Sequence, residues 1–223
     1  NFANKIWNAS RFVMMNLEGF EPDKIDIEKL TLKDRWILKR INDVTHEVTD
    51  SLEKFEIGIA AQKIYDFFWS EFCDWYIEMA KIDLYGDSEE GKKRTQKVLW
   101  TVLEQALKLL HPFMPFITEE IWQHIPHEGK SIMVSPWPRF KEEWNFDDTE
   151  QMELIMDAVR GIRNIRAEIN VPPGKKAFAV ARVSSPEVMG ILRDNLDIIY
   201  SLAKVSEMEL IDESSAIPEK AIS

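Results

Sequence analysis

The first seventeen residues carry apolar side chains at intervals of three or four positions. These side chains fall on one face of a helix and are Phe2, Ile6, Ala9, Val13 and Leu17. A second set lies off this stripe and combines amides, cations and an aromatic ring: Asn4, Lys5, Asn8, Arg11 and Phe12. The pattern predicts a helix that buries one side and offers hydrogen-bonding and stacking groups on the other.

The same spacing predicts a second helix that begins after Thr31. Thr31 followed by Asp34 resembles a capping box, in which each residue satisfies a free amide of the first turn. The expected buried stripe is Ile37, Ile41, Val44, Val48 and Leu52. Trp36 lies off the centre of this stripe, so it either packs in the core or offers a ring to an unstacked base.

The third predicted helix is the most apolar. Its stripe follows helical spacing through Ile57, Ala61, Ile64, Phe68, Phe72, Trp75 and Met79. Four further aromatic residues widen the apolar face, namely Tyr65, Phe67, Trp69 and Tyr76. We therefore expect this helix to be the centre of a bundle, with its aromatic rings in the core and Cys73 an inert buried thiol.

Two more helices complete the predicted bundle. One covers about residues 89–110, and a shorter one follows the His111-Pro112 interruption at about residues 117–124. Four to five amphipathic helices joined by short connectors predict a mainly α fold, an antiparallel helical bundle over residues 1–147.

Residues 148–223 read differently and predict a small α/β segment. After Thr149, a possible helix cap, a helix is expected to run to Ile169 and to stop at Pro172-Pro173-Gly174. Strands are expected at 177–183 and 205–211, with one helix from Pro186 to about Leu202 between them. Residues 131–134 also read as a short extended piece.

Composition narrows the class of protein. The formal net charge is −11, the hydrophobic fraction is 45%, and there is one cysteine among the 223 residues. These values fit a globular protein in a reducing compartment and argue against indiscriminate nucleic-acid binding. Every long apolar stretch is broken by charge before it reaches the roughly 18 residues that a membrane span needs.

Residues that could catalyse a reaction are poorly placed in the sequence. His124 and His127 have a spacing that could hold a metal, but Pro126 lies between them and no cluster of cysteines or carboxylates surrounds them. Glu119 and Glu120 read as a pair on a solvated helix face. No glycine-rich phosphate-binding motif occurs. We therefore predict no catalytic residue, metal site or cofactor in this chain.

Recognition chemistry remains, and a second basic stretch adds to the first helix. Residues 160–176 contain five cations against one anion, namely Arg160, Arg163, Arg166, Lys175 and Lys176. The three arginines recur every three residues, which suggests a shared face for a phosphate backbone. A helix end that uses cations against its macrodipole is the competing interpretation. For the first helix, the competing interpretation is a solvated face.

Several segments together resemble bacterial valyl-tRNA synthetases. They are NFANKIWNASRFV, DRWIL, YDFFWSEFCDWYIE, LHPFMPFITEEIWQ, PWP and IRNIRAEINVPP, and they stand in the order seen in that family, from Asn1 to at least Pro173. Isoleucyl- and leucyl-tRNA synthetases share the LHPFMPF-like element and the helical architecture. Their first helices read differently from NKIWNASRF, so the valyl family is preferred.

The resemblance implies an organisation of the whole protein. The chain would follow the KMSKS loop of a catalytic domain, form the class I anticodon-binding bundle, and stop before a C-terminal coiled-coil arm. The whole protein would be a cytoplasmic monomer that joins valine to its tRNA with ATP and Mg²⁺. The chain would contact valine tRNA, the catalytic domain and the arm.

The resemblance also assigns residues. Arg11 and Trp36, helped by Asn4, Lys5 and Asn8, would line a pocket for anticodon bases, with Phe12 beside them. The tRNA backbone would be contacted by Arg160, Arg163, Arg166, Lys175 and Lys176. Two alternatives stay open: the equivalent region of an isoleucyl or leucyl enzyme, and a helical protein-interaction module that never binds RNA. A steep loss of binding with salt would indicate RNA.

Overall fold

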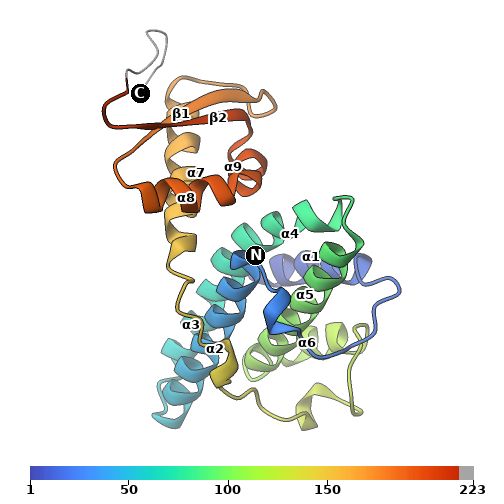
Figure 1. Cartoon of the computed structure of the whole chain (residues 1–223). Helices are drawn as coiled ribbons and strands as arrows, with labels where there is room; N and C mark the ends of the chain where they lie inside the picture. The colour runs from blue at the N-terminus through green and yellow to red at the C-terminus, as the bar shows by residue number, and fades with distance from the viewer. Residues whose placement is uncertain (216–223) are drawn as a thin grey trace. The chain divides into compact units, whose positions relative to one another are not determined.

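The computed structural model describes residues 1–215 and divides the chain into two compact units, one ending at Asp147 and the other beginning at Asp148 (Figure 1). The first unit is entirely helical and the second combines helices with two strands. The predicted fold class, a mainly α chain with a helical bundle followed by a small α/β segment, is confirmed.

The helices of the first unit are α1 (Phe2–Met15), α2 (Leu32–Glu53), α3 (Ile57–Asp66), α4 (Ile77–Leu84), α5 (Glu89–Leu110) and α6 (Pro115–Trp122). A π-helical segment, η2 (Phe67–Tyr76), joins α3 to α4 without a break. Short 3₁₀ turns occur at η1 (Ile27–Lys29), η3 (Ile132–Val134) and η4 (Glu142–Trp144).

The core of the bundle forms where α2 and α5 pack against each other and against the α3–η2–α4 stretch. Phe68 and Phe72 of η2 are fully buried, as are Ile37 of α2 and Val102 of α5. The expectation that the third helix lies at the centre of the bundle is therefore confirmed. Helix α1 packs on η2, α5 and α6, and buries the predicted stripe from Ile6 to Val13.

The helix ends follow local sequence chemistry. The backbone amide of Thr31 donates to Asp34 Oδ2 at 3.2 Å, so the predicted capping box at the start of α2 is confirmed. Ser88 caps α5 by accepting from the Gly91 amide at 3.0 Å. Pro115 occupies the first turn of α6, where its missing N–H costs no helical hydrogen bond.

The second unit contains α7 (Gln151–Glu168), β1 (Ala177–Val183), α8 (Pro186–Asp194), α9 (Leu196–Ala203) and β2 (Val205–Asp212). The two strands pair in parallel, with Ala179 opposite Met208. Parallel neighbours need a crossover, and α8 and α9 provide it, lying together on one side of the strands (Figure 1).

Four local expectations were wrong. Residues 132–134 form a 3₁₀ turn that Ser131 caps through the Met133 amide at 3.1 Å, so no strand forms there. Helix α7 begins at Gln151 with Glu150 as its cap, in place of Thr149.

The other two concern helices that were expected to be uninterrupted. The helix expected from Pro186 to Leu202 is broken at Asn195, whose side-chain amide donates to the Ile191 carbonyl at 2.8 Å. The helix from Ile57 contains the π-helical turns of η2, and Ile57 itself is exposed.

Within residues 1–215, no helix combines the length and hydropathy that crossing a membrane would require.

Candidate nucleic-acid interface

The exposed face of α1 carries three polar side chains without partners. Asn4, Asn8 and Arg11 are exposed and follow one another at intervals of four and three residues, so they share one face. Among the described residues, none of the three side chains makes a hydrogen bond or an ion pair. On the opposite face, Ile6 and Val13 are fully buried and fix the rotation of the helix. This face therefore offers two amides and a guanidinium to a ligand.

One flank of this face meets η2 and α4. Lys5 Nζ lies 2.6 Å from Asp74 Oδ1 and 4.7 Å from the centre of the Trp69 ring. Phe12, half-buried, has Lys81 Nζ 5.6 Å from its ring centre. Lys5 and Phe12 thus line the side of α1 that faces the α3–η2–α4 stretch.

Sequence reasoning missed an aromatic residue on the exposed face. Trp7 lies between Asn4 and Arg11 on the helix surface and is 43% exposed. Met15, one turn after Arg11, is also exposed. A tryptophan outside the apolar stripe was the available signal, because a ring that the stripe does not need for packing is free to stack on a base.

Trp36 does not belong to this interface. Its side chain, on α2, is 3% exposed and packs in the core of the bundle, so it has no ring face to offer a base. The structure therefore does not support the hypothesis that Trp36 lines an anticodon pocket. Burial of an indole at the head of an amphipathic helix removes more apolar surface from water than stacking at the rim would.

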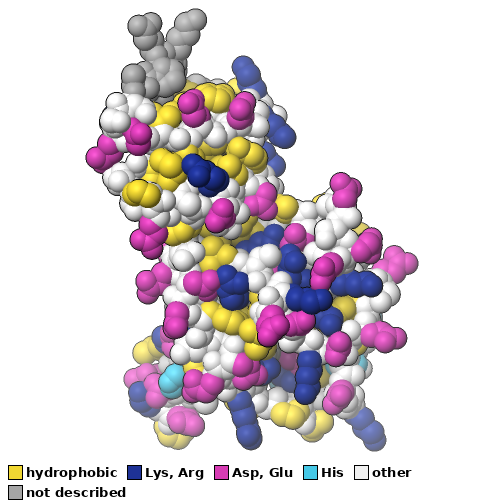
Figure 2. Space-filling view, in the orientation of Figure 1, with side chains coloured by type: hydrophobic (Ala, Val, Ile, Leu, Met, Phe, Trp, Pro, Cys, Tyr) yellow, Lys and Arg dark blue, Asp and Glu magenta, His cyan; other side chains and the backbone are white. Residues whose placement is uncertain are grey.

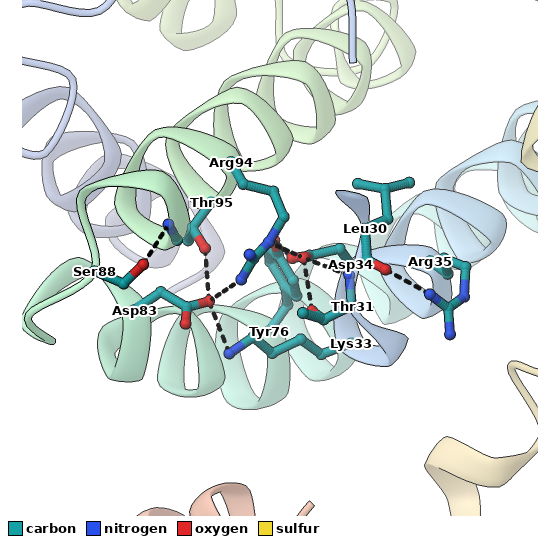
Figure 3. Close-up of polar contacts among 11 residues, drawn as sticks. Leu30, Thr31, Lys33, Asp34, Arg35, Tyr76, Asp83, Ser88, Arg94 and Thr95 are labelled. Atoms are coloured by element: carbon teal, nitrogen blue, oxygen red, sulfur yellow. Dashed lines mark hydrogen bonds and ion pairs between the residues drawn. The ribbon is translucent and has the colours of Figure 1, made fainter. Parts of the chain in front are cut away.

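A buried polar network supports the elements behind the interface (Figure 3). Asp34 of α2 accepts from Tyr76 Oη of η2 through Oδ1 at 2.8 Å, and from Arg94 Nε of α5 through Oδ2 at 2.8 Å. Burial raises the pKa of Tyr76, and the neighbouring Asp34 raises it further. The phenol therefore stays a hydrogen-bond donor at neutral pH.

The network continues to α4 through Asp83. Its Oδ2 accepts from Lys33 Nζ at 2.9 Å, Arg94 Nη2 at 2.9 Å and Thr95 Oγ1 at 2.8 Å (Figure 3). Burial raises the pKa of Asp83, but Lys33 and Arg94 outweigh it and hold the pKa below its usual value. Two carboxylates face two cations, so the network is neutral and ties α2, η2, α4 and α5 together.

Two arginines of the basic stretch in the second unit already have interaction partners. Arg160 pairs with Asp157 at 2.7 Å and lies 3.7 Å from Glu153. Arg163 is exposed, and its Nε donates to the Leu202 carbonyl at 3.0 Å. Arg160 and Arg163 therefore already have partners within their unit.

Arg166 points inward. It is 9% exposed, and its guanidinium donates to the carbonyls of Lys175 at 2.7 Å, Lys204 at 3.3 Å and Pro172 at 3.4 Å. The structure does not support the expectation that Arg166 contacts a tRNA backbone, because its donors are engaged within the unit. Lys175 and Lys176 are exposed and form no ion pair in the part of the chain that the structure describes.

His124 and His127 each lie against a nearby backbone carbonyl, and Cys73 is buried as the sequence predicted. His124 Nδ1 lies 2.8 Å from the Glu120 carbonyl, and His127 Nδ1 lies 2.9 Å from that of Ile125. Across residues 1–215, no three His, Cys, Asp or Glu side chains are grouped so that they could hold a metal ion. Cys73 is buried, which raises the pKa of its thiol to about 12.

Charge is mixed over the surface that Figure 2 shows, where Lys and Arg side chains are interspersed with Asp and Glu. With a net charge of −11, a nucleic acid must be held by local groups and not by the overall field. The cations that can bind a phosphate are therefore those without a carboxylate partner, such as Arg11.

Comparison with known proteins places the chain in a family. Residues 34–182 match the family described as the anticodon-binding domain of tRNA ligase. The match covers most of the first unit and ends in β1 of the second, and it begins in α2, so α1 lies outside it.

The chain is also similar over its whole length to curated valine–tRNA ligases. It is 48% identical over 223 residues to that of Carboxydothermus hydrogenoformans and 46% identical over 224 residues to that of Geobacillus stearothermophilus. It is 48% identical over 225 residues to that of Clostridium tetani. In each case all of this chain aligns with 25% of the relative's length.

Proposed function

Because this chain belongs to the family of anticodon-binding domains of tRNA ligases, we propose that it is the anticodon-reading part of a valine–tRNA ligase. Its ligand is then the anticodon loop of valine tRNA. The whole-length similarity to curated valine–tRNA ligases favours this assignment over an isoleucine or leucine enzyme.

The observation that carries this proposal is the set of unpartnered side chains on α1. Unpaired loop bases expose their hydrogen-bonding edges and both ring faces. Asn4 and Asn8 can each pair with a base edge through one donor and one acceptor. Arg11 can bind a phosphate or stack on a base, and Trp7 beside it adds a ring.

The flank of α1 extends the same site. Phe12 and Lys5 stand next to Asn8 and Arg11 on the helix surface.

Lys175 and Lys176 of the second unit contribute contacts to the tRNA backbone, because they are exposed and carry no competing carboxylate within residues 1–215. Arg160 and Arg163 are weaker candidates for such contacts, since each is already engaged.

The chemistry of ligation would belong to the whole protein. We propose a cytoplasmic monomer that joins valine to its tRNA with ATP and Mg²⁺, in which this chain adjoins a catalytic domain and a C-terminal arm. The described residues hold no group of carboxylates or histidines suited to a metal ion, and the sequence has no phosphate-binding motif. In that protein, the role of this chain would be to position tRNA through its anticodon-binding domain.

The proposal is tested by Arg11→Ala in the whole ligase. Aminoacylation of valine tRNA should fall at least tenfold in kcat/KM, a loss of about 1.4 kcal/mol of transition-state binding. Valine-dependent ATP–pyrophosphate exchange should not change, because valine activation does not involve the anticodon.

Arg139→Ala is the matched control. Arg139 is also exposed and free of ion pairs within the described chain, but it lies in the 136–140 segment, away from α1 in sequence. It should leave both reactions unchanged. An equal fall in exchange and aminoacylation on Arg11→Ala would contradict the assignment, as would charging of isoleucine or leucine tRNA in preference to valine tRNA.

A further inference from the structure

The first unit contains a cavity that is separate from the exposed face of α1. The cavity has a volume of about 720 Å³ and lies between α5, the connector at residues 22–27 and the segment at residues 141–144. No described residue of α1 lines it. Its volume falls within the range of pockets that bind small molecules.

Two polar side chains of α5 form the floor of the cavity. Thr101 and Gln105 are four residues apart, so they lie on the same face of the helix. They are 8% and 7% exposed, and neither side chain makes a hydrogen bond with another described residue. Neither polar group is sealed off completely, as Ser10 Oγ and Trp122 Nε1 are, so both keep access to the cavity. Because buried polar groups are normally hydrogen-bonded, these two side chains point to a ligand that supplies the missing partner.

Lys141 adds a cation at the side of the same cavity. Its Nζ lies 3.9 Å from the centre of the Trp144 ring and forms no ion pair within residues 1–215. Asn42, which is 1% exposed, holds the Lys141 backbone, because its Oδ1 accepts from the amide at 2.8 Å and its Nδ2 donates to the carbonyl at 2.9 Å. Burial lowers the pKa of Lys141, and the nearby Glu143 and Glu104 offset only part of this effect. An anion in the cavity would supply the missing counter-charge.

The connector forms the third side of the cavity and is tied to α5. Asp23 Oδ2 accepts from Lys97 Nζ at 3.0 Å, and the ring centres of Phe20 and Trp100 are 5.8 Å apart. Trp100 is fixed in turn by its Nε1, which donates to the Pro126 carbonyl at 2.8 Å. With Trp100, three side chains of the connector give this side an apolar wall, namely Pro22, Ile25 and Ile27. Such a wall suits a planar, largely apolar group.

We propose that this cavity binds a nucleoside monophosphate as a free small molecule. The phosphate binds Lys141, with the exposed Lys24 at the rim as a second cation. Lysine side chains then hold the phosphate in place of a glycine-rich loop. The inference goes beyond the proposed function, because reading an anticodon needs no small-molecule ligand.

The other parts of a nucleotide match the remaining groups of the cavity. The base packs against Trp100, and its edge meets the Gln105 amide, which donates and accepts at once, and the Thr101 hydroxyl. Glu143 is exposed and has no ion pair in the described chain, so its carboxylate accepts from a ribose hydroxyl. Inorganic phosphate would satisfy Lys141 alone and leave the two α5 side chains without partners.

Isothermal titration calorimetry on the full chain tests the proposal. The ligands are AMP, GMP, CMP and UMP, with the corresponding nucleosides and inorganic phosphate as partial ligands. At least one nucleotide should bind at a single site, about tenfold or more tightly than its nucleoside or inorganic phosphate.

Three variants assign the binding to the cavity. Lys141→Met should weaken the nucleotide by about tenfold and leave the nucleoside unchanged, whereas Gln105→Met should weaken both. Lys24→Met changes an exposed side chain, so the core stays intact, and it should weaken the nucleotide alone by about threefold. Lys130→Met is the matched control, since Lys130 is exposed and has no ion pair in the described chain, and it should change neither affinity. Circular dichroism shows whether each variant is folded.

Three results would overturn the inference. The first is that no nucleotide binds up to about 10 mM. The second is that a nucleotide binds but keeps its affinity in folded Lys141→Met, Gln105→Met and Lys24→Met, which would place the site elsewhere. The third is that a hairpin with the anticodon loop of valine tRNA displaces the nucleotide and depends on the same residues, because the cavity then holds RNA. The proposed function is judged separately, by Arg11→Ala.

Discussion

Arg166, in the last turn of α7, connects that helix to the two segments that lead into β1 and β2. Its guanidinium donates to three carbonyls, from the 172–175 loop and from Lys204, which has a positive φ of 55° at the end of α9. A charged donor that serves several carbonyls at once stabilises more than an exposed ion pair does. The side chain is therefore structural, although its sequence neighbourhood suggested a phosphate contact.

Arg166→Ala should lower the free energy of unfolding by about 2–3 kcal/mol, because the carbonyls lose a buried charged partner. Urea denaturation followed by circular dichroism measures this change. Arg160→Ala on the same helix is the control and should cost less than about 1 kcal/mol, since Arg160 is paired at the surface. Equal losses in the two variants would show that the inward placement of Arg166 contributes nothing.

The spacing of residues predicts a face, but it does not predict which way the face points. Asn4, Asn8 and Arg11 could be placed because a strong apolar stripe on α1 fixed the rotation of the helix. Arg166 could not, because its burial depends on carbonyls of the 172–175 loop and of Lys204, 38 residues away, and helical spacing carries no information on how these approach α7. Trp36 failed for a similar reason, since packing between α2 and its neighbours decides its burial.

At the scale of elements, the neutral network around Asp34 and Asp83 sets the relation between α2, η2, α4 and α5 (Figure 3). Lys33 is almost fully buried and depends on Asp83 for its counter-charge. Losing one member of such a pair leaves an uncompensated charge in the interior. The network thus holds η2, and with it Asp74, at a fixed place behind α1.

Asp83→Asn should destabilise the chain by about 3 kcal/mol at neutral pH. The pKa of Asp83 is held below its ordinary value of 3.8, so the stability that its ionised form contributes is present above that value. That contribution is lost as the pH falls through the lower, folded pKa. The difference in unfolding free energy between the wild type and Asp83→Asn should therefore shrink below about pH 4.

Asp50→Asn serves as the control for this measurement. Asp50 pairs with Lys54 at the surface, so its removal should change the unfolding free energy little at any pH. A difference between wild type and Asp83→Asn that stays constant down to low pH would mean that the ionised carboxylate is not the stabilising species. Urea titrations at a series of pH values decide between these outcomes.

The helices themselves were largely predictable, because their apolar spacing, capping residues and prolines act locally. The 89–110 helix and the 177–183 strand were found with their observed bounds. The π-helical turns of η2 were not, since apolar residues at Phe68, Phe72 and Trp75 satisfy an α-helical spacing too. The looser winding there becomes visible only in the backbone of the folded chain.

For the whole molecule, a net charge of −11 sets a constraint on RNA binding. Exposed charges are screened beyond about 8 Å at physiological ionic strength, so contacts must come from cations close to the RNA. Free cations occur in both units, with Arg11 in the first and Lys175 and Lys176 in the second. We expect a division of labour, in which α1 discriminates bases and the two lysines bind phosphates without regard to sequence.

The double variant Lys175→Ala/Lys176→Ala separates these roles. Each phosphate contact contributes about 0.7 to 0.9 to the slope of log affinity against log salt, so removing two should lower the slope for valine tRNA by about 1.5. Discrimination between anticodon bases should not change, whereas Arg11→Ala should reduce it. Lys92→Ala/Lys93→Ala removes two lysines with no ion pair in the described chain, from the start of α5, and controls for the change in charge. If Lys92→Ala/Lys93→Ala lowers the slope more than Lys175→Ala/Lys176→Ala does, the backbone contacts belong to the bundle, and the second unit does not take part in binding.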